Sequence, residues 1–139
     1  SQVLQRVQRL AILPQAYKDL GVRRDGLTAI LTHILADKDH YYLQLFIENS
    51  SSAAFEVEEI TFDYVSGSGE RIQAAPIYSP NEATVPARTC KSWVYVLASY
   101  ALKQKDKLEM TLWEKRGARH LQLVIPSFIL LNSLYEGSE

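Results

Sequence analysis

The sequence has little cysteine and no excess of charge of either sign. Its single cysteine, Cys90, excludes an internal disulfide and cannot build a zinc site without histidine or carboxylate ligands, so a packed small side chain is its simplest interpretation. The 15 basic and 16 acidic residues give a net charge of −1. Such a chain has no overall field that gathers phosphate backbones, so direct binding of nucleic acid is disfavoured.

Long apolar runs are also missing. No stretch approaches the twenty apolar residues that a membrane span needs, and no charged-then-apolar leader is present. We therefore expect contact with a membrane only through partner proteins. Ser1 stands where an initiator Met would be, which suggests an excised or processed piece of a longer protein.

The residue patterns of known catalytic and metal sites are missing as well. The three histidines, His33, His40 and His120, match no compact metal motif. There is no Gly-rich phosphate loop, no Gly-x-Ser-x-Gly elbow and no cysteine in a catalytic setting. Glu58 and Glu59 should alternate to opposite sides of a strand and so could not share a substrate. The sequence predicts a protein that is not an enzyme and binds no metal or cofactor.

What is present is a clear hairpin from Leu108 to Ile125, with its turn at Arg116-Gly117. Apolar and polar residues alternate strictly around this turn, and glycine can supply the positive φ that tight hairpin turns need. A slip by one residue would turn every leucine outward, so the pattern fixes the register. The inner face pairs Leu112 with Leu121, Met110 with Leu123 and Leu108 with Ile125. The outer face carries Glu109, Thr111, Trp113, His120, Gln122 and Val124.

Other segments also have strand patterns. Tyr41 to Glu48, Val57 to Val65 and Lys91 to Leu97 are typical strands. The residues expected to point inward in the first two are Tyr41, Leu43, Leu45, Ile47, Ile60, Phe62 and Tyr64. Three prolines make the segment from residue 71 to residue 86 irregular or edge-like. Phe128 to Leu131 fits a last strand or a short helical turn.

Leu27 to Ala36 is ambiguous, because its apolar residues fit either a helix or a strand buried on both faces. Its β-branched residues favour the strand. Before it, Val3 to Ala11 has the spacing of a short amphipathic helix that Pro14 should end, followed by one further turn at residues 17–21 and a polar connector at residues 23–26. We therefore expect a helical lead-in at residues 1–25, packed on or leading into a domain at residues 26–139.

Six or seven short strands separated by polar turns predict two packed antiparallel sheets. The predicted fold is mostly β: an antiparallel β-sandwich, immunoglobulin-like in general architecture, with a short N-terminal helix. The pattern leaves the order of the strands open.

Several stretches resemble one known family. The segment Glu114-Lys115-Arg116-Gly117-Ala118-Arg119-His120-Leu121 is similar to the Glu-Lys-Asn-Gly-Gly-Arg-His-Leu signature of the C-terminal domain of the conjugative transposon TraN family of Bacteroides-type bacteria. Asn49-Ser50 matches its Asn-x-Ser between strands, and Ile60-x-Phe62 matches its Ile-x-Phe. The resemblance spans residues 26–125. It departs at Arg116-Gly117-Ala118, where the family has Asn-Gly-Gly, and in the family's Lys-Arg-Thr-Ala-x-Gln-Glu stretch, of which only Arg71 and Ala74 remain.

This resemblance implies a structural, protein-interaction component of a conjugative DNA-transfer apparatus of the type IV secretion kind. It implies a place in the periplasm or at the outer envelope, and partners that are other proteins of the apparatus. An oligomer is possible. It also favours the strand interpretation of Leu27 to Ala36.

Candidate partner-contact residues are Trp113 and His120, opposed on the outer face of the hairpin, and Arg119 at its tip. Exposed aromatic side chains can anchor a partner protein or stack on sugars, and Trp93 and Tyr95 share a face of their own strand. The other possibility, which we favour slightly, is that the N-terminal helix or the second sheet covers the outer face of the hairpin. A carbohydrate- or peptide-binding sandwich is therefore the alternative function. Glu114 should pair with Arg119 across the hairpin.

Overall fold

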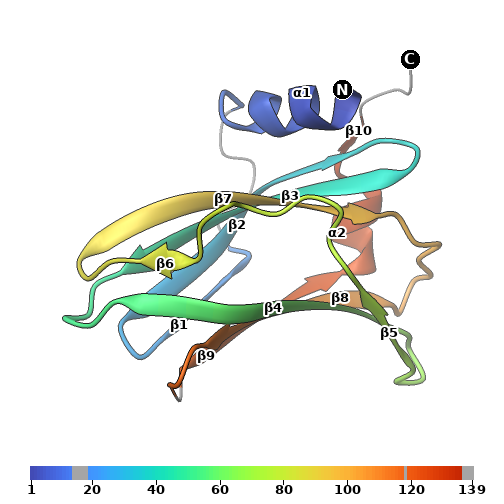
Figure 1. Cartoon of the computed structure of the whole chain (residues 1–139). Helices are drawn as coiled ribbons and strands as arrows, with labels where there is room; N and C mark the ends of the chain where they lie inside the picture. The colour runs from blue at the N-terminus through green and yellow to red at the C-terminus, as the bar shows by residue number, and fades with distance from the viewer. Residues whose placement is uncertain (14–18, 118, 136–139) are drawn as a thin grey trace.

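Two antiparallel sheets pack face to face as a sandwich, with a short helix on one outer face (Figure 1). The computed structural model describes residues 1–13, 19–117 and 119–135. The predicted fold class, mostly β with an N-terminal helix, is confirmed. The elements are α1 (Gln2–Leu10), β1 (Gly21–Arg24), β2 (Leu27–Ala36), β3 (His40–Asn49), β4 (Phe55–Val65), β5 (Arg71–Ala74), β6 (Thr84–Val85), β7 (Thr89–Ala98), β8 (Lys107–Glu114), β9 (His120–Pro126), α2 (Ser127–Leu131) and β10 (Leu134–Tyr135).

The first sheet has the strand order β1-β2-β3-β7. β1 pairs with the start of β2, and β10 pairs with the end of β2. Leu27 to Ala36 is a strand, as its β-branched residues indicated, and most of its residues are buried on both faces. The four residues of β3 expected to point inward are all buried. β10 runs parallel to β2, whereas the sequence pattern suggested only antiparallel neighbours.

The second sheet has the order β5-β4-β8-β9, with β6 beside the start of β4. The predicted hairpin is β8–β9 in the predicted register, with Leu112 opposite Leu121, Met110 opposite Leu123 and Leu108 opposite Ile125. Each of these six side chains is at most 3% exposed. The alternation of the sequence therefore determined both the pairing and the buried face.

The core lies between the sheets and combines side chains from the inner faces of both. Phe62 and Tyr64 of β4 contribute to it as expected, while Ile60 is partly buried at its margin. Trp93 and Tyr95 are 3% and 4% exposed within this core. The interpretation of these two aromatics as outward-facing contact residues is wrong, because β7 turns them toward the second sheet.

Helix α1 covers the outer face of the first sheet (Figure 1). Its Val7 and Leu10 pack on an apolar cluster supplied by β2, β3 and β7. That cluster consists of Leu35, Tyr42 and Val96. This cover explains why Leu35 of β2 is fully buried although it lies on the outer face of the sheet.

A buried carboxylate fixes the helix on this sheet. Asp37, with its side chain 4% exposed, is ion-paired with Arg6 of α1. The same carboxylate accepts hydrogen bonds from the Tyr42 hydroxyl (2.6 Å) and from the backbone NH groups of Asp39 and His40 (both 2.8 Å). Burial opposes ionisation of Asp37, but these hydrogen bonds prevail, so its pKa lies below the usual value.

The residues before β2 differ from the expected connector. Arg23 and Arg24 belong to β1, which pairs with β2, and only Asp25 and Gly26 form the turn, both with positive φ. Polar side chains suit β1 because it is an exposed edge strand, where arginine also discourages pairing with other chains. Pro14 and the first two residues of the turn expected at residues 17–21 lie outside the described residues, while Gly21 belongs to β1. The division of the chain at residue 25 stays a prediction.

A β-bulge interrupts β4 between Val57 and Glu59. Before the bulge, Phe55 and Val57 face the core; after it, Ile60, Phe62 and Tyr64 do. Inward positions therefore change from odd to even numbers, and both intervening glutamates are exposed. The expectation that Glu58 and Glu59 point to opposite sides is wrong, because the bulge adds one residue to the alternation.

Candidate partner-contact site

Trp113 and His120 lie side by side on the outer face of the second sheet, as the register predicted. The Glu114 NH donates to the Arg119 carbonyl (3.0 Å), so Glu114 and Arg119 are a hydrogen-bonded pair and the next pair, Trp113 and His120, is not. Side chains of non-hydrogen-bonded pairs approach most closely. The two rings stack with their centroids 5.3 Å apart and their planes 20° apart.

The indole of Trp113 is exposed. Its Nε1–H donates to the Thr61 hydroxyl on β4 (3.3 Å), while 43% of the residue remains accessible. Helix α1 packs on the other sheet, so the interpretation that this face is covered, which the sequence slightly favoured, is wrong for Trp113. With its NH satisfied inside the chain, the ring offers a partner mainly its π surface.

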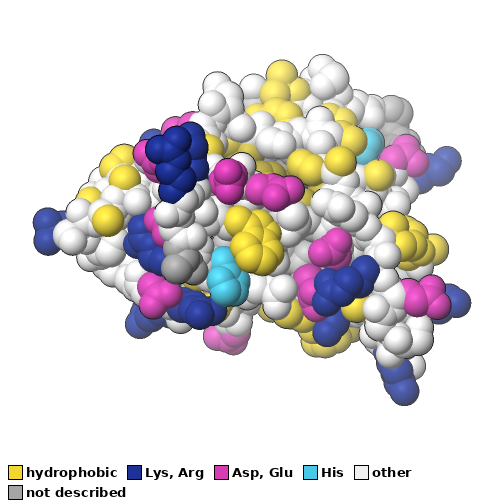
Figure 2. Space-filling model, turned by 60° about the horizontal axis from the view of Figure 1, so that its bottom comes forward, with side chains coloured by type: hydrophobic (Ala, Val, Ile, Leu, Met, Phe, Trp, Pro, Cys, Tyr) yellow, Lys and Arg dark blue, Asp and Glu magenta, His cyan; other side chains and the backbone are white. Residues whose placement is uncertain are grey.

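Three cross-strand rows make up the outer face around this pair. Figure 2 looks onto this face, where a hydrophobic side chain lies beside a histidine, with acidic side chains nearby. The rows run across β4, β8 and β9: Glu59–Trp113–His120, Thr61–Thr111–Gln122 and Asp63–Glu109–Val124. The middle row is uncharged, and Gln122 donates to the Thr111 hydroxyl (3.2 Å).

Basic side chains neutralise the third row. Arg71 lies 2.7 Å from Glu109 and 3.6 Å from Asp63, and Lys107 lies 3.4 Å from Glu109. Burial opposes ionisation of Glu109, but the hydrogen bonds from Arg71 and Lys107 prevail and hold its pKa below the usual value. This end of the face is therefore electrically balanced.

The first row is not balanced in this way. Across the described residues, Glu59 has no ion pair, and neither do Glu58 or Glu56, the exposed glutamates that precede it on β4. At the opposite end of the row, Arg24 Nη1 lies 3.5 Å from His120 Nε2. Sequence reasoning missed this acidic group because it did not anticipate the bulge that turns Glu58 outward.

Arg119 is held inside the chain rather than projecting from the hairpin tip. Its Nε donates to both carboxylate oxygens of Glu114 (3.0 and 3.1 Å), and its side chain is only 17% exposed. The guanidinium also lies over the Phe55 ring, 5.5 Å from its centroid. The hydrogen bonds from Arg119 lower the pKa of Glu114. The predicted cross-strand ion pair is present, and this placement favours a positioning role for Arg119; its contact with a partner stays a prediction.

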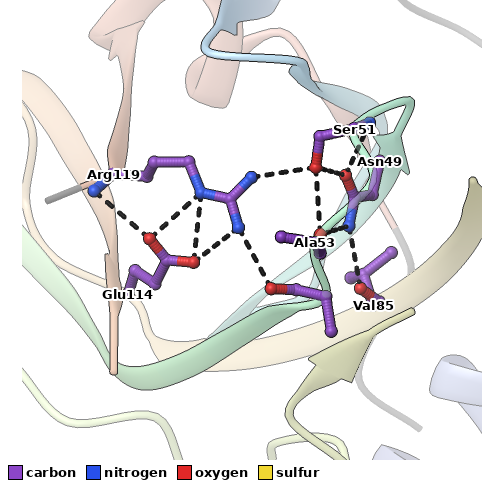
Figure 3. A network of polar contacts seen from close by, with 7 residues as sticks. Asn49, Ser51, Ala53, Val85, Glu114 and Arg119 are labelled. Carbon is purple, nitrogen blue, oxygen red and sulfur yellow. Dashed lines mark hydrogen bonds and ion pairs between the residues drawn. The ribbon is translucent and has the colours of Figure 1, made fainter. Parts of the chain in front are cut away.

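The same guanidinium connects the hairpin tip to the loop after β3 (Figure 3). Arg119 donates to the Ser51 hydroxyl (3.1 Å) and to the Ala54 carbonyl (3.0 Å). Asn49, fully buried, accepts from the Ser51 NH (3.0 Å) and hydroxyl (2.6 Å) and donates to the carbonyls of Ala53 and Val85 (2.9 and 3.0 Å). Two of the stretches that carried the family resemblance, one at Asn49 and one at Glu114 to Leu121, thus meet in one polar network.

Gly117 makes room for this network. A Cβ at this position would lie 2.1 Å from Glu114 Oε1, so a side chain here would displace the carboxylate that holds Arg119. The positive φ of the turn belongs to Arg116 (56°) and not to Gly117. The expectation that glycine supplies the positive φ is therefore wrong. Arginine is unfavourable in this conformation, whereas asparagine, which the resembled signature has at this position, tolerates it.

Strand β9 forms one edge of the second sheet. Because the register places its hydrogen bonds to β8 at Leu121, Leu123 and Ile125, the backbone groups of His120, Gln122 and Val124 point away from β8. β1 runs close to β9 without pairing with it. Gln122 and Val124 are exposed, and β9 carries no charged residue that would discourage an added strand.

Two further observations bear on the function classes. Within the residues that the structure describes, no group of three His, Cys, Asp or Glu side chains is placed to hold a metal ion, and the expected absence of metal, cofactor and catalysis stays a prediction. No helix among the described residues is long and apolar enough to cross a membrane.

Comparison with known proteins gives one family assignment. No curated protein matches the chain. The family model described as a domain of unknown function (DUF4138) matches residues 3–134. This span begins in α1, ends in β10 and includes both sheets with the polar network. The chain belongs to the DUF4138 family.

Proposed function

We propose that this domain is a non-enzymatic structural component of a conjugative DNA-transfer apparatus of the type IV secretion kind, and that it works by binding other proteins of the apparatus. The observation that carries the proposal is the stack of the exposed Trp113 on the partly buried His120, beside the outer edge of the uncharged strand β9. An edge offers backbone donors and acceptors, and an exposed aromatic supplies surface that a partner can desolvate. Aromatic residues of this kind dominate the binding energy of many interfaces.

The resemblance to the conjugative transposon TraN family supports the choice of apparatus. Two of the stretches that carry it, at Asn49 and at Glu114 to Leu121, form one network that fixes the hairpin bearing Trp113 and His120. A signature with this structural role is expected wherever the same hairpin must be presented in the same position. The proposal places the domain in the periplasm or at the outer envelope, where it meets membranes and nucleic acid only through its partners.

A mating experiment tests the proposal. A donor strain in which this domain carries Trp113→Ala with His120→Ala should transfer DNA about tenfold or more less often, because losing an interface hot spot costs about 2 kcal/mol or more. Both side chains lie outside the core, so the melting temperature of the purified variant should stay within a few degrees of the wild type.

The matched control is Ile77→Ala. Ile77 is 55% exposed and lies beside β7 of the first sheet, away from the proposed surface. Its variant should transfer normally. If the Trp113/His120 variant is stable, abundant and transfers as well as the control, the proposed function is wrong.

One observation favours the second candidate, a carbohydrate-binding module. Tyr100 is 41% exposed, stacks on Tyr64 with centroids 5.0 Å apart, and borders a cavity of about 300 Å³ whose other walls include Ser68, Glu70 and Asp106. An aromatic ring beside hydroxyls and carboxylates is a surface on which sugars can bind. Binding of neutral oligosaccharides that Tyr100→Ala abolishes would support this candidate.

A further inference from the structure

Three exposed carboxylates lie within four residues of β4, the strand beside Trp113, and the bulge in β4 turns one of them outward. Glu56, Glu58 and Glu59 are all exposed, while their neighbours Phe55 and Val57 face the core. Without the bulge, strict alternation would send one member of the Glu58-Glu59 pair inward. The extra residue therefore brings a third carboxylate to the outer side of the strand next to β8.

These carboxylates differ from the acidic residues at the other end of the face. Asp63 and Glu109 are paired with Arg71, and Glu109 is paired with Lys107 as well. The glutamates near Trp113 have no ion pair in the described parts of the chain, although the Lys115 NH donates to the Glu56 carbonyl (2.8 Å) nearby. Negative charge on this face is thus concentrated next to Trp113.

We propose that Glu58, Glu59 and Trp113 form a binding surface for a lysine or arginine side chain in an extended, basic segment of a partner protein. This inference rests on the proposed function and specifies the chemistry of the partner. Glu59 lies directly opposite Trp113 in the register, so a cation above the indole is also within reach of a carboxylate. A cation over an indole gains about 0.5–1 kcal/mol at an exposed site, and each carboxylate contact adds about 0.2–1 kcal/mol.

The charges of the row also orient the partner. Arg24 contacts His120 at the β9 end, while the unpaired glutamates lie at the β4 end. A cationic side chain is therefore attracted toward β4 and repelled from β9. We expect the partner segment to place its basic side chain over Trp113. The rest of the segment should then lie over the uncharged row of Thr61, Thr111 and Gln122.

Other occupants fit this surface less well. Phosphate groups of nucleic acid or lipid would face three uncompensated carboxylates. A second copy of the domain would bring the same three carboxylates against them. A neutral sugar could stack on Trp113 but would gain nothing from the charge, so it is the alternative that the experiment must separate.

The experiment measures binding of three probes to the purified chain: a blocked hexapeptide of alternating Thr and Lys, its Thr and Glu counterpart, and a neutral hexasaccharide. Emission of Trp113 reports binding, because Trp93 is 3% exposed and unaffected by solutes. The lysine peptide should bind, the glutamate peptide and the sugar should not, and 0.5 M salt should weaken the binding. Glu58→Gln with Glu59→Gln should raise the dissociation constant about five- to tenfold.

Asp39→Asn with Glu48→Gln is the matched control, since it removes the same charge from exposed positions elsewhere. It should leave the dissociation constant within about twofold. The inference is overturned if the lysine peptide does not bind, if both double variants weaken it equally, or if the sugar alone shifts the emission.

The mating experiment separates this inference from the function on which it rests. If Trp113→Ala with His120→Ala abolishes transfer but Glu58→Gln with Glu59→Gln transfers normally, the proposed function holds and the basic partner segment is wrong. If the peptide binds as expected but the Trp113/His120 variant transfers normally, the surface chemistry holds and its assignment to DNA transfer is wrong.

Discussion

The two outer faces of the sandwich differ in what covers them. The first sheet carries an apolar cluster on its outer side that α1 covers: Val7 and Leu10 of the helix pack on it, and Arg6 pairs with the buried Asp37. The second sheet has three cross-strand rows of mostly polar residues and one aromatic pair, of which Trp113 is exposed. The apolar cluster of the first face is covered by a helix of the same chain, whereas the second face is open to solvent or to a partner.

The difference shows that the pattern of apolar and polar residues along a strand indicates whether its outer face is covered. β8 and β9 alternate strictly, as strands with one solvated face do. Most residues of β2 are buried whichever face they lie on, and α1 packs on Leu35 of its outer face. Alternation thus indicates an open face, and its loss indicates a covered one. Four variants test whether the two faces differ in this way.

The largest effect is expected from Met110→Asp. Met110 is fully buried on the inner face of β8, and an unpaired carboxylate there costs several kcal/mol, a large share of the roughly 5–15 kcal/mol that stabilises a domain. Val124→Asp, on the outer face of the neighbouring strand, should lower the free energy of unfolding by less than about 1 kcal/mol. Urea denaturation of both variants measures the contrast. Equal losses would mean that the outer face of the second sheet is not open.

A smaller effect is expected on the covered side from Asp37→Asn. Losing hydrogen bonds to a buried charge should lower the free energy of unfolding by about 1–3 kcal/mol at pH 7. Because the pKa of Asp37 is lower in the folded chain, its stabilisation is complete above the unfolded value, about 3.9, and is lost as the pH falls through the folded value. The difference between wild type and variant should therefore shrink when urea titrations are repeated from pH 6 down to pH 3. A constant difference would contradict this.

Gly117→Ala tests how the open face is held in position. The added methyl group would collide with the Glu114 carboxylate and release Arg119 from it. We expect a loss of about 1–2 kcal/mol, since several hydrogen bonds to charged groups are disturbed in a partly exposed place. In a chain that already carries Glu114→Gln and Arg119→Gln, Gly117→Ala should lower the free energy of unfolding much less. An equal loss of stability in that chain would mean that Gly117 is needed only for the backbone conformation of the turn.

The smallest effect, and the only gain, is expected from Arg116→Asn. Asparagine adopts positive φ more readily than arginine, so the variant should be up to about 1 kcal/mol more stable. Thermal denaturation should show a rise of a few degrees. Lys115→Asn, next to it, is the control and should show no gain.

The parts of the fold that follow from local alternation could be predicted, and the parts that depend on distant segments could not. The hairpin register and the positions of Trp113 and His120 follow from a two-residue period. The bulge at Glu58 adds one residue where the composition gives no sign of it. The network of Asn49, Ser51 and Arg119 joins positions up to 70 residues apart, and no pattern within one strand can reveal it.

The completion of the first sheet has a kinetic consequence. β10 pairs with β2 at Leu35 and Ala36, with about a hundred residues of chain between the partners. A pairing this distant in sequence requires closure of a very large loop, so folding should fall in the slow, millisecond-to-second range of all-β domains. During synthesis the rest of the sheet can assemble before β10 is made, and this part of the edge of β2 stays unpaired in the meantime. Until then the growing chain carries an exposed strand edge, which is the period when it is most open to aggregation or to a chaperone.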